Sequence, residues 1–209
     1  MARVLHVSAS PRGERSQSRK AGHDFLAAWQ AKHPADTVTE RDVGRHPPGH
    51  VTEAWVAAAF TPPDGQTADT RAALAESDAL VDELLAHDVI LVSAPMYNFG
   101  VPSALKAWID NIVRVGRTFN FDPSKPNPYV PLVHGKRLFA VIAAGGGGYG
   151  PGGPMHALNY EDGYLKAVFG FMGVTDAKVL YVENASAGGE KLDQSLAQLK
   201  TAIGEAVAA

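Results

Sequence analysis

Residues 88–105, DVILVSAPMYNFGVPSAL, constrain how the rest of the chain can be arranged. The apolar run Val89–Val92 predicts a buried strand that ends at Ala94–Pro95. A loop at 96–100 follows, and Pro102 suits the first turn of a new helix because its missing N–H needs no partner there. In an open α/β sheet, ligands bind beyond the carboxyl ends of the strands, so this loop is expected to face a ligand.

The side chains of this loop suit a flat ligand. Met96, Tyr97 and Phe99 offer polarisable surface, and Asn98 adds a hydrogen-bond donor and an acceptor. Together they favour a planar heteroaromatic group. The alternative is that Met96 and Phe99 only anchor the loop to the core.

Length and composition indicate a globular protein, and we expect residues 1–209 to form a single domain. Hydrophobic residues make up 45% and charged residues 20%, and no apolar run is long enough to span a bilayer. The net charge of −3 comes from 19 basic and 22 acidic residues without a basic stripe. We therefore expect neither a membrane partner nor a nucleic-acid partner.

The sequence contains no cysteine, which excludes disulfides, thiolate catalysis and cysteine-ligated metal clusters. The first residues lead directly into an apolar strand without a leader pattern, so we expect a cytoplasmic location. His46 and His50 are four residues apart, but Pro47–Gly49 between them forbids a shared helix face. No metal site is predicted.

The first strand is expected at 3–8, and a second candidate ligand loop follows it. The polar segment 9–18 leads into a helical pattern at 21–32, so Ser16 or Ser18 lies at or near a helix N-terminus. Free amides and the helix dipole favour a phosphate there, and Ser10, Ser16 and Ser18 can donate further hydrogen bonds. The alternative is ordinary N-capping by one serine, with the others exposed.

The rest of the chain alternates strands and helices. Further strands are expected at 37–43, 138–143 and 178–182, and further helices at 51–60, 67–87, 102–114, 162–171 and 191–207. The strand at 37–43 should lie near the sheet edge, and 117–131 should form a flap or hairpin. Two of these helices have clear inner faces. In the helix at 67–87 the face consists of Leu74, Val81, Leu84 and Leu85, and in the helix at 102–114 it consists of Leu105, Trp108, Ile109 and Ile112.

A third candidate loop is rich in glycine. Gly145, Gly147 and Gly150 match the dinucleotide pattern G-x-G-x-x-G, but Pro151–Pro154 follows where a helix should begin. We favour the interpretation that the backbone of this loop packs directly against a ligand, since glycine has no side chain to prevent such close contact. A Rossmann site remains the alternative.

Five alternating strands predict a doubly wound parallel α/β sheet with helices on both faces. In a flavodoxin-like order, 2-1-3-4-5, the three loops meet at the switch point where a mononucleotide such as FMN binds. The serine loop would then hold the phosphate, and the other two loops would flank the ring.

These residues resemble the FMN-dependent NADH azoreductases, also called NADH:quinone oxidoreductases, of flavodoxin-like fold. The resemblance rests on Ser8–Ser10, Ser16–Ser18, Ala94–Phe99 and the Gly170–Asp176 stretch GFMGVTD. It implies FMN contacts at Ser10, Ser16, Gln17, Ser18, Met96, Tyr97, Asn98, Phe99, Ala144, Gly145, Gly146 and Gly147. The family often has a Ser-Arg-Gly-Gly-like sequence at 144–147, so this chain lacks a hydroxyl and a positive charge that bear on flavin potential and substrate preference.

The resemblance also implies a reaction. NADH, with NADPH possible, would reduce tightly but non-covalently bound FMN, and a quinone or azo compound would then be reduced by two electrons, in a ping-pong sequence without a catalytic side chain. It implies a homodimer whose site is built partly from the neighbouring subunit. Candidate substrate-pocket walls are Phe60, Phe119, Phe121, Tyr129 and Phe171.

Two other classes of function are considered. A flavodoxin-like electron carrier would have no nicotinamide turnover of its own, but it usually has a strongly acidic face, which a charge of −3 does not suggest. A serine hydrolase built on Ser10 or Ser16 lacks the G-x-S-x-G elbow.

Overall fold

Five parallel strands form the central sheet of the protein, seen in a computed structural model that describes residues 1–208. The strands are β1 Arg3–Ser8, β2 Thr37–Asp42, β3 Val89–Pro95, β6 Arg137–Ala143 and β7 Asp176–Val182. Their order is β2-β1-β3-β6-β7, which confirms the predicted order 2-1-3-4-5 and places β2 at an edge. The reversal of strand order therefore lies between β1 and β3, as expected for a flavodoxin-like order.

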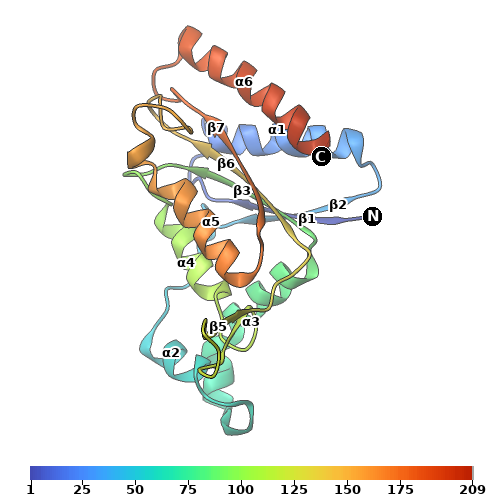
Figure 1. The fold of residues 1–209 in the computed structure, drawn as a ribbon, viewed down its shortest axis with the longest axis vertical. Coiled ribbons are helices and arrows are strands. Elements are labelled where there is room, and N and C mark those ends of the chain that lie inside the picture. The colour runs from blue at the N-terminus through green and yellow to red at the C-terminus, as the bar shows by residue number, and fades with distance from the viewer. Residues whose placement is uncertain (209) are drawn as a thin grey trace.

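Helices cover both faces of the sheet, also as predicted (Figure 1). One face packs against α1 Gln17–Lys32 and α6 Gly189–Ala208. The other packs against α3 Ala68–Ala86, α4 Ser103–Ile112 and α5 Tyr160–Met172. The short α2 Glu53–Ala59 and the 3-10 turns Pro63–Gly65 and His156–Leu158 complete the helical elements of the described chain.

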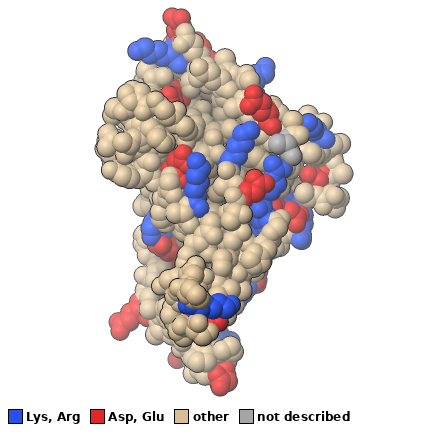
Figure 2. Space-filling view, viewed as in Figure 1, with Lys and Arg blue, Asp and Glu red and all other residues tan. Residues whose placement is uncertain are grey.

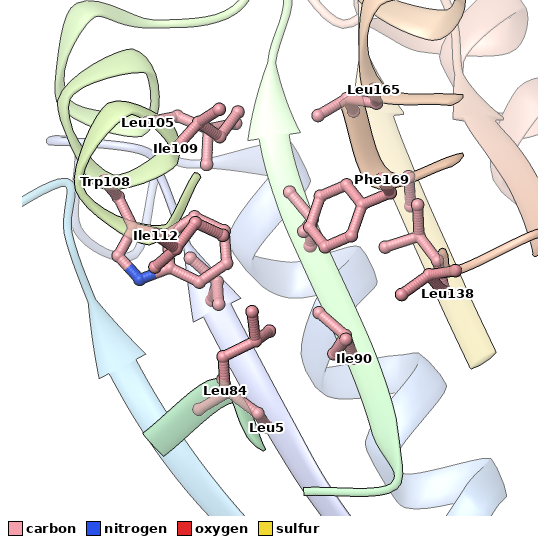
Figure 3. Close-up of a cluster of buried hydrophobic side chains, with 14 of the residues drawn as sticks. Leu5, Leu84, Ile90, Leu105, Trp108, Ile109, Ile112, Leu138, Leu165 and Phe169 are labelled. Carbon is pink, nitrogen blue, oxygen red and sulfur yellow. The ribbon is translucent and has the colours of Figure 1, made fainter. Parts of the chain in front are cut away.

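Alternation along the strands divides the core into two layers. In β3, Ile90 and Val92 belong to the cluster under α3, α4 and α5, whereas Val89 and Leu91 belong to the cluster under α1 and α6. The rings of Trp108 and Phe169 lie with their centroids 6.3 Å apart in the first cluster, which also contains Ile90 (Figure 3). Burying each such side chain stabilises the fold by about 1.5–3 kcal/mol, so both faces of β3 hold the sheet between its helices.

The expected inner face of α4 is confirmed, because all four of its predicted residues are buried. The expected face of α3 is partly wrong. Leu85 is 36% exposed, whereas Leu80, which the sequence analysis omitted, is buried. Leu84 is fully buried, and the next residue in a helix points about 100° away from it, toward solvent here.

A small hairpin extends from the main sheet at the end where α2 lies (Figure 1). It pairs β4 Phe119–Phe121 with β5 Tyr129–Pro131 in antiparallel register, which confirms the predicted hairpin. Basic and acidic side chains are interspersed on the face seen in Figure 2. Within residues 1–208, no helix is both long and apolar enough to cross a membrane.

Candidate functional site

A cleft of about 190 Å³ opens beyond the carboxyl ends of β1, β3 and β6, where the three predicted ligand loops meet. Residues of the serine loop, the 96–100 loop and the glycine loop all contribute to its walls. The lining residues are Ser10, Arg12, Ser16, Gln17, Ser18, Pro95, Met96, Tyr97, Ala143, Gly145, Ala185 and Ser186. A second cleft of about 270 Å³ lies beside it at the ends of β1 and β3, with Ala9, Tyr97 and Pro102 in its walls. Two other large clefts, one beside Phe60 and one between α1 and α6, lie away from the strand ends.

The serine loop forms a compact polar cradle at the start of α1. Ser16 is the N-cap, and its Oγ accepts a hydrogen bond from the Arg19 amide at 3.2 Å. Its Oγ also lies 3.2 Å from that of Ser18, and Ser10 Oγ accepts from the Arg12 amide at 3.3 Å. All three serines are buried although they border the cleft, so the alternative of exposed serines is wrong.

The first two amides of α1 have no carbonyl partner inside the helix, as at any helix start. The amides of Gln17 and Ser18 also have no hydrogen-bond partner elsewhere in residues 1–208. Together with the helix dipole and the serine hydroxyls, they suit an anionic group such as a phosphate.

Arg19 holds this cradle in shape. Its guanidinium forms two hydrogen bonds to Asp42, at 2.9 and 3.0 Å, and donates to the carbonyl of Ser10 at 2.7 Å. Burial works against the charge of Asp42, but hydrogen bonds from Arg19 and the Arg45 amide outweigh it and keep the pKa of Asp42 below its ordinary value. Because Arg19 is committed to these partners, it positions the loop rather than facing a ligand.

The 96–100 loop is a tight turn with unusual backbone. Tyr97 and Gly100 exchange two backbone hydrogen bonds of 3.0 Å, while Asn98 and Phe99 have φ of 49° and 71°. Left-handed φ is costly for a side chain such as phenylalanine, by roughly 1–2 kcal/mol. Tyr97 and Phe99 are 41% and 43% exposed, so the strained turn presents aromatic surface instead of only anchoring the loop. Met96, in contrast, packs partly against the core.

The glycine loop is fixed by the segment after β7. The amides of Asn184, Ala185 and Ser186 donate to the carbonyls of Gly146, Ala144 and Gly145 at 2.9–3.0 Å. A Cβ on Gly145 would meet Ser186 Oγ at 2.8 Å, and one on Gly147 would meet Asn184 Oδ1 at 2.7 Å. A side chain at either position would therefore displace Ser186 or Asn184, a contact inside the chain that the sequence analysis did not foresee.

The hydrogen bonds of Glu183 argue against a dinucleotide-binding site in this loop. Its carboxylate accepts hydrogen bonds from the amides of Gly148, Tyr149 and Gly150 at 2.7–2.9 Å. These amides are where a pyrophosphate would bind in a Rossmann turn. A carboxylate of the chain already neutralises them, and α5 begins only at Tyr160.

The predicted pocket aromatics fall into two places, and none of the five lines the cleft at the strand ends. Four gather on the hairpin and the end of α5, with ring centroids 4.8 Å apart for Phe119 and Phe171 and 5.4 Å for Tyr129 and Phe171. Phe121 joins them at 5.6 Å from Tyr129. Phe60 is 70% exposed after α2 and borders a different cleft. Their assignment as substrate-pocket walls remains a prediction.

Several residues of the site were missed by the sequence analysis. Arg12 borders the cleft from within the serine segment, where its positive charge could have drawn attention to it. Arg19 and Asp42 pair across 23 positions, and Ser186 and Glu183 reach the glycine loop from beyond β7, so no local pattern marks them.

Comparison with known proteins agrees with this arrangement. Residues 2–207 match a family described by its flavodoxin-like fold. The FMN-dependent NADH:quinone oxidoreductase 2 of Trichormus variabilis is 48% identical over 208 residues, covering 100% of this chain and 99% of the relative. The FMN-dependent NAD(P)H:quinone oxidoreductase 1 of Pseudomonas aeruginosa is 49% identical over 197 residues, 93% of each chain.

Among solved structures, the azoreductase from Bacillus anthracis superposes with a TM-score of 0.87 at 26% identity over 99% of both chains. The sheet order, the cleft at the strand ends and the match over nearly all residues lead to the same assignment. This chain belongs to the flavodoxin-like fold family.

Proposed function

We propose that this protein is an FMN-dependent NAD(P)H oxidoreductase that reduces quinones and azo compounds by two-electron hydride transfer. The observation that carries the proposal is one cleft that joins a buried serine cradle at the N-terminus of α1 to exposed aromatic surface from Tyr97. The names of the quinone oxidoreductase relatives and of the structurally similar azoreductase support the same activity.

The residues present fit FMN at both of its ends. The phosphate suits the hydroxyls of Ser10, Ser16 and Ser18 and the two free amides of α1, with the charge of Arg12 close by. The ring suits the surface of Met96 and Tyr97 on one side of the cleft and the backbone at Gly145 on the other. Asn98, Phe99, Ala144, Gly146 and Gly147 do not line this cleft, and their contacts with FMN remain predictions. No side chain of residues 144–147 extends beyond a methyl group, and Ser186 lies against Gly145 in the wall of the cleft.

FMN, when bound, supplies hydride acceptance and donation. The chain itself binds and orients. Arg19 and Asp42 keep the phosphate loop in one conformation, and the strained turn fixes Tyr97, Asn98 and Phe99. Asn98 is exposed beside these rings and can donate or accept a hydrogen bond at the ring edge. The nicotinamide donor and the acceptor would use the same open face in turn.

The proposal includes a homodimer. The aromatic cluster of the hairpin lies away from its own chain's cleft, and Phe121 and Tyr129 are about half exposed. Aromatic side chains at this exposure are typical of interfaces. A second subunit could therefore supply these rings to the cleft of the first. The chain is further proposed to act as a single domain in the cytoplasm, where reduced nicotinamide is available.

An anaerobic absorption experiment tests the proposal. The purified protein should show flavin bands near ~370 and ~450 nm that bleach on addition of NADH or NADPH, and it should consume the donor steadily when menadione is added. Bleaching without steady turnover would favour an electron carrier. A colourless protein that does not take up FMN would overturn the proposal. An Asn98→Ala variant should retain its fold but show slower flavin reduction.

A further inference from the structure

Two histidines and a glutamate meet on the α1 side of the sheet, outside the cleft described above. His6 lies on β1 and Glu40 is its neighbour in register on β2. His23 approaches from α1 because Gly22, the residue before it, lets the helix pack tightly on the strands. A Cβ on Gly22 would lie 2.7 Å from His6 Nε2. Three elements therefore bring one nitrogen or oxygen atom each to within 4.8 Å of one another.

His6 is the fixed member of the group. It is fully buried, and its Nε2 lies 2.8 Å from Ser93 Oγ. Its Nδ1 is also buried and has no hydrogen-bond partner in the described chain, although it points to Glu40 at 3.7 Å. A buried polar atom without a partner lowers the stability of the fold, so a ligand bound to this nitrogen would remove that cost.

The chemistry of the ring suits a cation. In the tautomer whose Nε2 donates to Ser93 Oγ, Nδ1 carries the lone pair, and a metal-bound histidine commonly donates its other nitrogen in this way. Burial, with smaller contributions from His23 and Arg19, lowers the pKa of His6 to about 4, so the imidazole is neutral at neutral pH.

The spacing is close to that of a tetrahedral site. Zinc bonds of about 2.0–2.1 Å place neighbouring ligands about 3.3–3.4 Å apart. Here Glu40 Oε1 lies 3.7 Å from His6 Nδ1 and 3.6 Å from His23 Nε2, and all three ligand atoms lie within 4.8 Å of one another. The side chains of His23 and Glu40 are 55% and 50% exposed, so they can close the remaining distance while His6 stays in place.

We propose that His6, His23 and Glu40 bind a divalent transition-metal ion such as Zn²⁺, with water at an open fourth position. Two imidazoles and one carboxylate form a recognised ligand set for this ion. The site is separate from the cleft at the strand ends, and its occupancy does not depend on the oxidoreductase activity.

Calorimetric titration with ZnCl₂ tests the proposal on tag-free, flavin-loaded protein that has been treated with chelator and dialysed. One Zn²⁺ should bind per chain. His23→Ala and Glu40→Gln should each weaken binding more than tenfold, and both changes lie at exposed side chains that the fold tolerates. His134→Ala and Glu53→Gln, at exposed residues outside the group, are matched controls that should bind as the wild type does.

A second readout reports the geometry. Co²⁺ should give the visible d–d bands of tetrahedral coordination in the wild type and the controls, and lose them in the two ligand variants. The proposal is overturned if the wild type binds no stoichiometric Zn²⁺ at micromolar concentration, or if the ligand variants bind as tightly as the controls.

Discussion

Ser16 serves both the helix and the candidate ligand site. Its hydroxyl accepts a hydrogen bond from the Arg19 amide and so satisfies one of the free amides at the start of α1. The same hydroxyl borders the cleft beside Ser18. Because a hydroxyl both donates and accepts, it can cap the helix and still donate its proton to a phosphate.

Ser16→Ala should therefore lose two things. Loss of the cap should lower the free energy of unfolding by about 1 kcal/mol. Loss of a hydrogen bond to a charged phosphate should weaken FMN binding at least about tenfold. Thr67→Ala removes the N-cap of α3, which lies outside the cleft, and is the matched control. Denaturant unfolding and FMN titration measure both effects, and equal FMN affinity in the two variants would contradict the assignment.

Phe99 has a left-handed backbone that disfavours any side chain. Phe99→Gly and Phe99→Ala both remove the ring, but only glycine removes the strain. The glycine variant should be more stable than the alanine variant by about 1 kcal/mol. Denaturant unfolding of both variants measures this difference. An alanine variant as stable as the glycine variant would mean that the turn relaxes in solution.

Glu161 is a buried carboxyl in the first turn of α5, and neither of its oxygens has a hydrogen-bond partner in the described chain. Burial raises its pKa from 4.5 to about 8. Below the lower value the folded and unfolded states are both protonated, so the group adds no pH dependence to stability. Above it the unfolded chain ionises while the folded protein keeps its proton, so stability falls as pH rises toward the higher value.

Glu161→Gln should remove this pH dependence. Its free energy of unfolding relative to the wild type should increase by about 1 kcal/mol per pH unit between about pH 5 and 8. Denaturant unfolding at several pH values measures the slope, and any constant cost of the new amide does not change it. Glu53→Gln, at an exposed position, should give no such slope. A flat difference for Glu161→Gln would show that the carboxyl ionises in the folded protein.

At the scale of elements, α1 connects the phosphate cradle to the sheet. Its N-terminus forms the cradle, and its contact with β1 and β3 depends on Gly22 lying against His6 and Ser93. The helix can approach the strands so closely only where no Cβ intervenes. The position of the cradle therefore depends on packing one turn further along the helix.

Gly22→Ala should destabilise the protein by about 1–3 kcal/mol, because the new methyl group would overlap two buried side chains. Gly204→Ala is the matched control, since nothing lies within 4 Å of its Cβ position on α6. There the substitution should stabilise by about 0.5–1 kcal/mol through helix propensity alone. Thermal and denaturant unfolding compare them, and effects of the same sign would contradict this account of how α1 packs.

At the scale of the whole molecule, the separation of the hairpin aromatics from their own cleft can be tested by mixing chains. One variant carries Ser16→Ala with Ser18→Ala in the cradle, and the other carries Phe121→Ala with Tyr129→Ala in the hairpin. If each site takes its cradle and its aromatics from different subunits, co-refolding inactive variants at equal amounts should restore about a quarter of wild-type activity. Quinone reduction measures this, and no recovery would place both parts of the site within one chain.

Local sequence determined most of the fold. Apolar runs such as 89–92 specify buried strands, the spacing of Leu105, Trp108 and Ile112 specifies a helix with one inner face, and Ser16 marks a helix start. These signals depend on only a few neighbouring residues, so they can be recognised from the sequence without the structure. The alternation predicted a doubly wound parallel sheet, and the order 2-1-3-4-5 with three loops at the switch point came from the flavodoxin-like resemblance; the structure confirms the order and brings the loops together.

Tertiary structure alone decided the contacts between distant residues. Arg19 pairs with Asp42, and Glu183 accepts hydrogen bonds from the amides after Gly147. Both contacts depend on strands that become neighbours only in the folded sheet. The same holds for the meeting of His6, His23 and Glu40, which requires the register of β1 with β2. Periodicity shows which face of an element is buried, but the partner on that face is set by packing across the whole molecule.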